Sequence, residues 1–255
     1  MKSILVRLFG YHAMFLHGDP LVLDRWLWLK KRLPKISPGA KTAIEIGCGN
    51  GAFTIGAAHR GYQALGIDFN EETICVAKYR ADLCGARLAD FDVVDIRNLN
   101  QQNGLSSQFD IAICFETIEH ILNDGKLMLD ITGCLKEGGR LLLTTPSADF
   151  NPITSSDSGP FAATENGWHV RKGYQREDLI ELCRRSNLTV EEVSFCSGFL
   201  SQKIAWIQRV LSVKIHPIVG WIMILPLRIF PPVLDSFIRK FTGWPDYSIC
   251  LEAKK

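Results

Sequence analysis

Short apolar runs alternate with amphipathic stretches between residues 41 and 146. Apolar residues that recur every three or four positions indicate helices, and compact apolar runs between turn residues indicate strands. Strands are expected at 42–46, 63–68, 87–94, 109–115 and 140–145, and helices at 52–59, 71–85 and 118–135. Strands that alternate with helices form βαβ units, so this pattern predicts an α/β protein with a parallel sheet.

The pattern continues on both sides of this region. A helix is expected at 21–33 after the turn Gly18-Asp19-Pro20, a second helix at 176–186, and strands at 188–195 and 247–253. Residues 147–173, rich in Ser, Pro, Gly and Asn, predict a long loop of a kind that is usually functional. We expect an N-terminal helical cap at 1–40, a sheet domain at 41–200 and 245–255, and a helical insertion at 201–244.

A glycine-rich turn follows the first expected strand, where residues 43–51 read AIEIGCGNG. Glycine lets the backbone approach a ligand closely, and the N-terminus of the next helix presents amide donors. The G-x-G-x-G spacing differs from the G-x-G-x-x-G of dinucleotide folds. Glu45 beside the turn suits a ligand with a positive group and disfavours a pyrophosphate. A structural turn without a ligand is the alternative.

Acidic residues follow the next two strands. Asp68 ends the second strand, where its carboxylate could accept both hydroxyls of a ribose. Asp95 follows the third strand, placed for an adenine amino group, with Ile96 against the ring. The carboxyl ends of parallel strands form the ligand-binding edge of open α/β sheets. The alternative is that these are ordinary surface acids in loops.

With these motifs the chain resembles the class I S-adenosylmethionine-dependent methyltransferases, whose first motif is E-x-G-x-G-x-G. The resemblance covers about residues 41–198 and 246–255 and implies a seven-stranded, Rossmann-like sheet. In that fold the last strand is antiparallel, helices cover both faces, and residues 135–140 form a structural turn into the fifth strand. The implied cofactor contacts are Glu45, Gly47 and Gly49 on the methionine part, Asp68 on the ribose, and Asp95 with Ile96 on the adenine.

Methyl transfer from a sulfonium requires an acceptor held in line with the departing sulfur, and sometimes a base. On the expected helix from 118, Glu116, Glu119 and His120 lie at i, i+3 and i+4 and share one face. Two carboxylates and an imidazole there could bind a divalent cation or act as a base. The alternative is a helix start with acids near its positive end and a solvated histidine.

The sequence E-x-x-E-H at 116–120 resembles the ubiquinone-biosynthesis O-methyltransferases. The resemblance implies a magnesium ion at Glu116, Glu119 and His120 that helps to place a quinol hydroxyl. Similar histidine-containing segments precede the sixth-strand helix in that family, which makes His169 a second candidate base beside His120 and Glu119. Tyr11, His12 and His17 could close over the cofactor, although we expect them to be packing residues.

The composition excludes several classes. The chain has 255 residues, 47% apolar and 22% charged, with a net charge of +2, which excludes a disordered or collagen-like protein. Outside 201–244 the chain is net negative and has no basic-aromatic stripe, so a nucleic-acid partner is not expected. The eight cysteines form no C-x-x-C pair, and most lie in apolar runs. We therefore expect reduced, buried thiols of a cytoplasmic protein without a secretory signal.

Residues 201–244 differ from the rest of the chain. They contain six basic residues against one acid and the most apolar sequence in the protein. The longest uncharged run, 217–227, would reach about 16 Å as a helix and is too short to span a bilayer of about 30 Å. One interpretation is a helical subdomain packed on the core or on a second subunit. The other is a peripheral attachment through 203–241 to an anionic membrane surface.

These patterns predict a methyltransferase that uses S-adenosylmethionine on a small-molecule or lipid-linked acceptor. Oxygen is the expected acceptor atom, with nitrogen or carbon as alternatives. A quinone precursor or a polyprenyl-linked glycan at the inner face of the membrane would suit the insertion. A non-catalytic, membrane-attached protein that binds the cofactor is the competing class, and a nicotinamide-dependent oxidoreductase is weakened by the glycine spacing. The pattern does not specify the oligomeric state.

Overall fold

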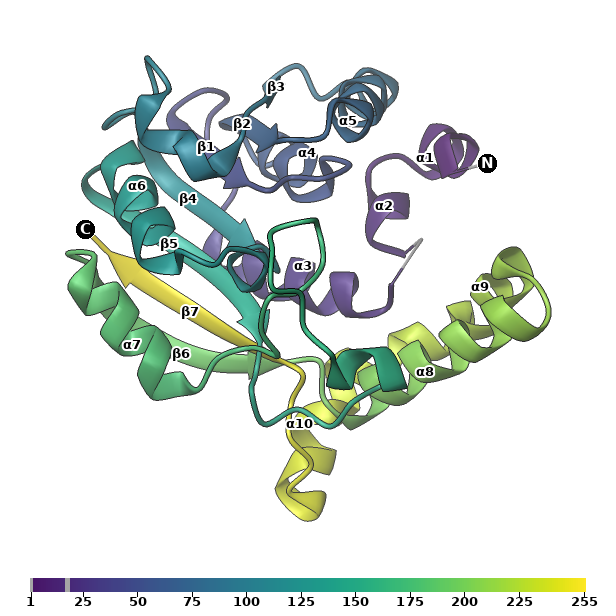
Figure 1. Cartoon of the computed structure of the whole chain (residues 1–255). Helices are drawn as coiled ribbons and strands as arrows, with labels where there is room; N and C mark the ends of the chain where they lie inside the picture. Colours follow the sequence, from purple (N-terminus) through teal and green to yellow (C-terminus); the bar gives the residue numbers. More distant parts are fainter. Residues whose placement is uncertain (1, 17–18) are drawn as a thin grey trace.

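A computed structural model describes residues 2–16 and 19–255 and has a seven-stranded sheet at its centre (Figure 1). The strand order is β3-β2-β1-β4-β5-β7-β6, in which β1 to β5 are parallel and β7 pairs antiparallel with both β5 and β6. The strands are β1 Lys41–Ile46, β2 Tyr62–Asp68, β3 Ala89–Val93, β4 Phe109–Phe115, β5 Leu135–Pro146, β6 Thr189–Cys196 and β7 Ser248–Lys254. The expected α/β class and the antiparallel last strand are confirmed.

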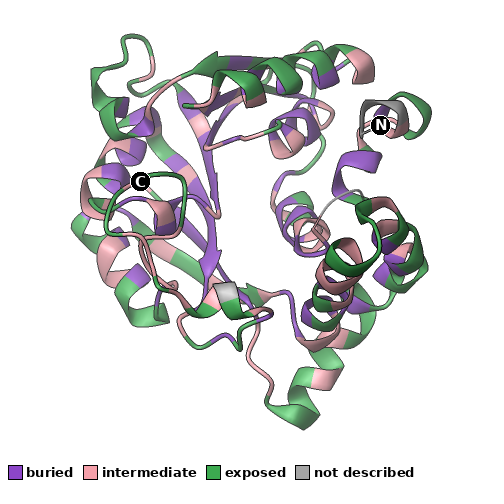
Figure 2. Ribbon diagram, turned by 45° about the vertical axis from the view of Figure 1, so that its right-hand side comes forward, coloured by how far each residue is buried: buried purple, intermediate pink, exposed green. Residues whose placement is uncertain are grey.

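Helices cover both faces of the sheet, and strand residues alternate between them. In β4, Ile111 and Ile113 pack into one apolar cluster, whereas Ala112 and Cys114 pack into the other. This period of two is what a sheet buried on both faces requires. Figure 2 shows the buried residues concentrated in the strands and on the inward sides of the helices.

The helices divide between the two clusters. The first face carries α1 Lys2–Phe9, α2 His12–Leu16, α3 Leu21–Arg32, α4 Ala52–Ala58 and α5 Glu71–Cys84. The second carries α6 Asp124–Cys134 and α7 Arg176–Arg185. Short 3-10 turns lie at η1 Ile96–Gln101, η2 Ile118–His120 and η3 Ser155–Ser158. Most predicted boundaries are confirmed to within two residues.

The predicted helix 118–135 is wrong at its beginning. Residues 118–120 form only the turn η2, and α6 begins at Asp124 after Asn123, whose side chain accepts a hydrogen bond from the Lys126 amide at 3.1 Å. Glu116 has a left-handed backbone with φ of 49°, so it cannot be part of a right-handed helix. Glu116, Glu119 and His120 therefore do not share a helical face. The predicted turn at 135–140 is also part of β5, which begins at Leu135.

The insertion connects β6 to β7 at the carboxyl edge of the sheet and is helical, as expected. It contains α8 Phe199–Lys214, α9 Pro217–Ile224, the turn η4 Leu225–Ile229 and α10 Pro231–Thr242. Helices α8 and α9 lie side by side beyond the end of β6 (Figure 1). The Asp235 carboxylate of α10 accepts the Leu200 and Ser201 amides at 2.6 and 3.1 Å and so caps α8.

None of the described helices is by itself long and apolar enough to cross a membrane. One pair of consecutive helical segments, Pro217–Ile229 and Pro231–Thr242, meets the length and composition criteria only when joined, and it is bent by 70°. All eight cysteines are free thiols. Five of them are buried and Cys75 is exposed, so burial is confirmed for most of them.

The close packing of α4 against α3 gives a test of how the N-terminal helices dock. A Cβ added at Gly56 would lie 2.5 Å from the Trp26 ring, which stacks on Phe15 at a centroid distance of 4.3 Å. We expect Gly56→Ala to lower the free energy of unfolding by about 1–3 kcal/mol, because overpacking exceeds the gain in helix propensity.

Gly133→Ala is the matched control for this substitution. Gly133 is exposed in α6, and an added Cβ there would meet no atom within 4 Å. This variant should gain up to about 1 kcal/mol from helix propensity. Urea unfolding of both variants measures the difference. Equal stabilisation by both would mean that α3 does not pack on α4 as described.

Candidate functional site

A cavity of about 360 Å³ opens at the carboxyl edge of the sheet. The glycine-rich turn, the segments after β2, β3 and β4, and the long loop form its walls. The lining residues are Gly47, Asp68, Phe69, Asp95, Ile96, Arg97, Glu116, Thr117, His120, Ile121, Glu165, Asn166 and Gly167. A wider hollow of about 960 Å³ lies against the starts of β1 to β4 and contains none of the predicted site residues. The predicted chemistry therefore gathers at the carboxyl edge, as expected for an α/β sheet.

Asp68 ties the glycine-rich turn to the end of β2. Its Oδ2 accepts the Gly49 amide at 2.9 Å, and its Oδ1 accepts the Asn70 amide at 2.9 Å. Each carboxylate oxygen can accept a second hydrogen bond, so the side chain can still bind a pair of hydroxyls in the cavity.

The glycines of the turn serve different purposes. Gly47 and Gly49 both have positive φ, 73° and 49°. A Cβ at Gly47 would lie 2.5 Å from Thr117 Oγ1, whereas one at Gly49 would meet no atom within 4 Å. The absent Gly47 side chain lets the turn approach the end of β4. Gly49, which was also predicted to contact the cofactor, does not line the cavity.

Glu45 does not line the cavity, contrary to its predicted contact with the methionine part of a cofactor. Alternation along β1 points its side chain toward α4, where Oε2 accepts the Thr54 amide at 2.7 Å and also the Thr54 hydroxyl. The side chain is 3% exposed, and burial raises the pKa of its carboxyl to about 8. Glu45 therefore fixes the first turn of α4 and supports the turn from beneath.

Asp95 and Ile96 line the cavity as predicted, but Asp95 has a partner that the sequence did not reveal. Arg97 donates to both of its oxygens, with Nη2 at 2.6 Å from Oδ2, and lies 3.5 Å from the Glu165 carboxylate. The hydrogen bond from Arg97 lowers the pKa of the Asp95 carboxyl. Asp95 is thus a fixed anion beside the apolar side chain of Ile96.

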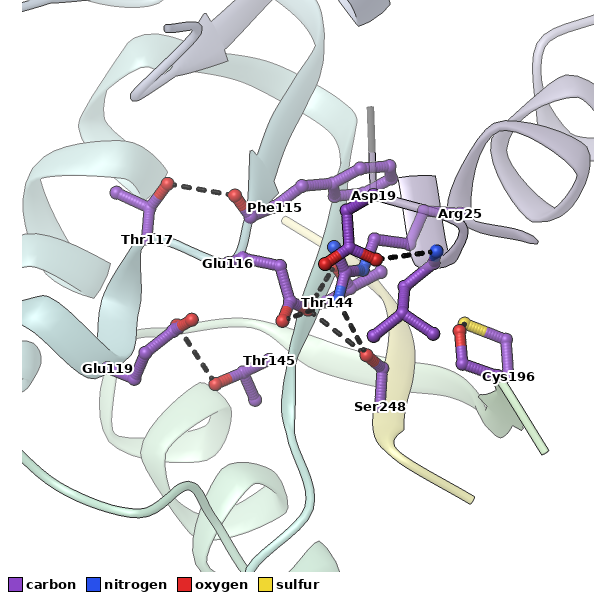
Figure 3. A network of polar contacts seen from close by, with 12 residues as sticks. Asp19, Arg25, Phe115, Glu116, Thr117, Glu119, Thr144, Thr145, Cys196 and Ser248 are labelled. Carbon is purple, nitrogen blue, oxygen red and sulfur yellow. Dashed lines mark hydrogen bonds and ion pairs between the residues drawn. The ribbon is translucent and has the colours of Figure 1, made fainter. Parts of the chain in front are cut away.

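Glu116 is held away from the predicted metal site. Its Oε2 forms an ion pair with Arg25 at 2.8 Å, and its Oε1 accepts the hydroxyls of Thr144 at 3.0 Å and Ser248 at 3.3 Å. Figure 3 shows Glu116 directed toward Arg25 and Ser248, while Glu119 is directed toward Thr145. Because its left-handed backbone turns it away, Glu116 does not join Glu119 and His120. The structure therefore does not bring the three predicted ligands Glu116, Glu119 and His120 together.

His169 takes the place that Glu116 was expected to fill. Oε1 of Glu119 lies 4.0 Å from His120 Nε2 and 3.9 Å from His169 Nε2, and the two rings are perpendicular at 4.6 Å. Burial raises the pKa of Glu119 well above its usual value, and the nearby Glu116 adds to the rise. Burial lowers the pKa of His120. Burial and the neighbouring His120 together lower the pKa of His169 to about 4. Both imidazoles are therefore neutral near pH 7.

This donor set does not fit magnesium. Mg²⁺ selects octahedral oxygen ligands, and Glu119, His120 and His169 supply one carboxylate and two imidazole nitrogens. The second carboxylate that the sequence suggested as a ligand is that of Glu116, which is paired with Arg25 instead. The magnesium site implied by E-x-x-E-H is therefore not formed by these residues.

The N-terminal candidates pack rather than line the cavity. Tyr11 stacks on His59 with the ring centroids 4.3 Å apart, and the His12 ring lies 4.0 Å from Tyr11. Neither residue borders the cavity. His17 lies outside the described residues. Packing is thus the role that the structure assigns to Tyr11 and His12.

A family model described as a methyltransferase domain matches residues 22–193. The chain belongs to this methyltransferase domain family. All of the residues that line the cavity, from the glycine-rich turn to the long loop, lie within the matched methyltransferase domain.

This methyltransferase domain is similar to ubiquinone biosynthesis O-methyltransferases of two bacteria. The protein from Dechloromonas aromatica is 30% identical over 127 residues, which are 50% of this chain and 51% of that relative. The protein from Idiomarina loihiensis is 31% identical over 164 residues, 63% of this chain and 65% of the relative. The matches thus span about half to two thirds of these curated relatives.

A solved structure has the same fold. Geranyl diphosphate C-methyltransferase from Streptomyces coelicolor, in complex with Mg²⁺, geranyl diphosphate and S-adenosyl-L-homocysteine, superposes with a TM-score of 0.59 at 14% identity. The match covers 90% of this chain and 76% of that one. At this identity the likeness shows the fold alone.

The methyltransferase domain gives a test at Asp68. We expect Asp68→Asn to weaken binding of S-adenosylmethionine by about tenfold or more, since a charged acceptor of hydroxyl hydrogen bonds is lost. Asp92→Asn is the control, because Asp92 is exposed in β3 and does not line the cavity. Calorimetric titration of the folded variants measures both. An unchanged dissociation constant for Asp68→Asn would show that the ribose lies elsewhere.

Proposed function

We propose that this protein is an S-adenosylmethionine-dependent methyltransferase that methylates an oxygen atom of a small, lipid-linked acceptor at a membrane surface. The observation that carries the proposal is the single cavity joining the glycine-rich turn, Asp68 and the Asp95–Ile96 pair to His120. The first three groups suit a cofactor with a ribose and an adenine. His120 supplies a base next to them.

The chemistry needs little more than position and a proton acceptor. The acceptor oxygen attacks the methyl carbon, the carbon–sulfur bond breaks, and S-adenosylhomocysteine leaves. The hydroxyl proton passes to a base. His120 lines the cavity and its pKa is lowered by burial, so its neutral imidazole can take that proton. Glu119 Oε1 lies 4.0 Å from its Nε2, and the His169 ring packs against it with the centroids 4.6 Å apart. The names of the two bacterial relatives support oxygen as the acceptor atom.

The apolar surface of the insertion supports a lipid-linked acceptor. More than half of the exposed large apolar side chains among the described residues lie between Trp206 and Phe241. On α10, Val233, Phe237 and Phe241 are 71%, 60% and 74% exposed and lie on one helical face. A patch of this kind marks an interaction surface, and an amphipathic helix with aromatic residues suits the bilayer interface.

Charge contributes less to this surface than the sequence suggested. Arg209 pairs with Asp19 at 3.2 Å and with Asp157 at 3.3 Å, Arg228 is buried against the Leu16 carbonyl, and Arg239 pairs with Asp246 at 2.5 Å. The exposed cations of the insertion are Lys203, Lys214, Arg239 and Lys240, and of these Arg239 is the one already paired with Asp246. Attachment would therefore depend mainly on apolar insertion, with a smaller contribution from anionic lipids.

The methyl transfer is tested with cofactor labelled at the methyl group. The protein is incubated with a bacterial lipid extract and, separately, with the water-soluble extract, and the products are identified by mass spectrometry. We expect a labelled methoxy group in the lipid fraction. His120→Ala should slow turnover by about a hundredfold and change cofactor affinity little.

The other outcomes distinguish the competing functions. Label found on nitrogen or carbon would contradict O-methylation and show that the protein is an N- or C-methyltransferase. Cofactor binding without transfer to either extract would favour a non-catalytic binding protein.

Flotation with vesicles tests the membrane surface. The protein is expected to float with vesicles that contain anionic phospholipid and less well with neutral ones. The double variant Phe237→Ser/Phe241→Ser should lose most of this binding, since burying one phenylalanine contributes about 1.5–3 kcal/mol. Leu129→Ser, at a residue 49% exposed on α6, is the control. The other outcome is that the protein does not float with vesicles but forms a dimer, which the double variant dissociates. This face would then be a contact between two copies of the chain.

A further inference from the structure

One carboxylate and two imidazoles converge next to the cavity, which one of them, His120, lines. Ligand atoms of Glu119, His120 and His169 all lie within 4.8 Å of one another. Glu119 is fully buried, and its Oε1 has no hydrogen-bond partner among the residues that the structure describes. A buried carboxylate oxygen without a partner is costly, and a bound cation would remove that cost.

We propose that Glu119, His120 and His169 bind a divalent ion of the later first transition series, represented by Zn²⁺ and Co²⁺, in preference to Mg²⁺. Imidazole nitrogen is a favoured ligand of these ions, and two histidines with one glutamate leave a coordination position open. His120 borders the cavity, so the open position faces the space that an acceptor would occupy. Binding of the ion does not rest on the proposed function, whereas its use to hold an acceptor oxygen does. In that case the ion, and not the coordinated His120 nitrogen, would make the hydroxyl more acidic.

The separations are close to those that a metal needs. In a tetrahedral zinc site with bonds of about 2.0–2.1 Å, ligand atoms lie about 3.3 Å apart. The distances from Glu119 Oε1 to the two Nε2 atoms are 4.0 and 3.9 Å. Small rotations of the side chains within their rotamer wells close the difference.

The backbone around the group is already fixed. The Val170 amide donates to the Glu119 carbonyl at 3.0 Å, which places His169 next to Glu119. Arg171 donates to the carbonyls of Ile121 at 2.8 Å and Leu122 at 3.1 Å. These bonds join the long loop, just after His169, to the segment after β4.

The hydroxyl of Thr145 orients the carboxylate. It donates to Glu119 Oε2 at 3.1 Å, which leaves Oε1 facing the two imidazoles. Partners of this kind fix ligand orientation in metal sites. Glu116 takes no part, because Arg25, Thr144 and Ser248 occupy both of its oxygens.

Metal titration of the full chain, stripped with a chelator, tests the proposal. Calorimetry with Zn²⁺, Co²⁺ and Mg²⁺ should show one site for the first two ions and about a hundredfold weaker binding of Mg²⁺. Bound Co²⁺ should give the visible absorption of a four- or five-coordinate site. His169→Ala and Glu119→Gln should each lower Co²⁺ affinity by about tenfold or more.

Two further variants act as controls. His216→Asn changes an exposed histidine and keeps a side chain able to cap α9, so it should leave Co²⁺ affinity unchanged. Glu116→Gln, checked for folding by thermal denaturation, should also leave it unchanged.

The proposal is overturned if Mg²⁺ binds as tightly as Co²⁺, if His169→Ala binds Co²⁺ like the parent chain, or if millimolar Co²⁺ does not bind. Binding of Co²⁺ by a protein that transfers no methyl group would refute the proposed function and support the metal site.

Discussion

The buried ion pair between Arg25 and Glu116 is the contact on which the shape of the cavity depends. Arg25 lies in α3 and is 8% exposed, so its guanidinium needs a partner inside the protein. Glu116 supplies that partner at 2.8 Å although its backbone is in the left-handed region, which carries a steric cost for a residue with a Cβ. The chain therefore leaves β4 in a new direction. The short turn that follows directs His120 to the cavity and Glu119 to the interior.

The loop at 147–173 depends on a second constraint, at its two ends. The Ala148 amide donates to the Tyr174 carbonyl at 2.8 Å, and the Tyr174 amide donates to the Pro146 carbonyl at 3.0 Å. Gly173 permits this approach, because a Cβ there would lie 2.1 Å from the Pro146 carbonyl oxygen. With both ends joined, the loop folds back over the segment after β4. His169 reaches Glu119 for this reason, even though 49 residues of chain separate the two.

Local patterns in the sequence were sufficient for the sheet and for half of the site. Strand β4 lies at 109–115 as predicted, because its apolar run is bounded by polar residues and buried on both faces. Gly47, Asp68 and Ile96 line the cavity as predicted, since the end of a strand fixes where the next residue points. Predictions that relied on a helix from 118 are wrong because the distant Arg25 controls the conformation of Glu116. A basic residue in an amphipathic helix gives no local signal of such a contact.

The charges in the insertion are a second case in which local sequence patterns could not predict a contact. From the sequence, basic surface residues were expected at Arg209, Arg228 and Arg239. Each of them instead bonds to a partner elsewhere in the same chain. Those partners lie in the N-terminal segment, in the long loop or just before β7, and no spacing rule connects them. The apolar face of α10 was visible in the sequence because helical periodicity is a local property.

The position of β7 between β5 and β6 has a consequence for the order of events during synthesis. Every other strand of the sheet, and the whole of α8 to α10, precedes β7 in the chain. Among the strands that the structure describes, β6 pairs only with β7, so it cannot join the sheet until β7 has been made. For that interval the nascent chain presents an unpaired strand edge next to its most apolar helices. An unpaired strand edge of this kind is prone to aggregation, so the incomplete sheet depends on β7 to cover it.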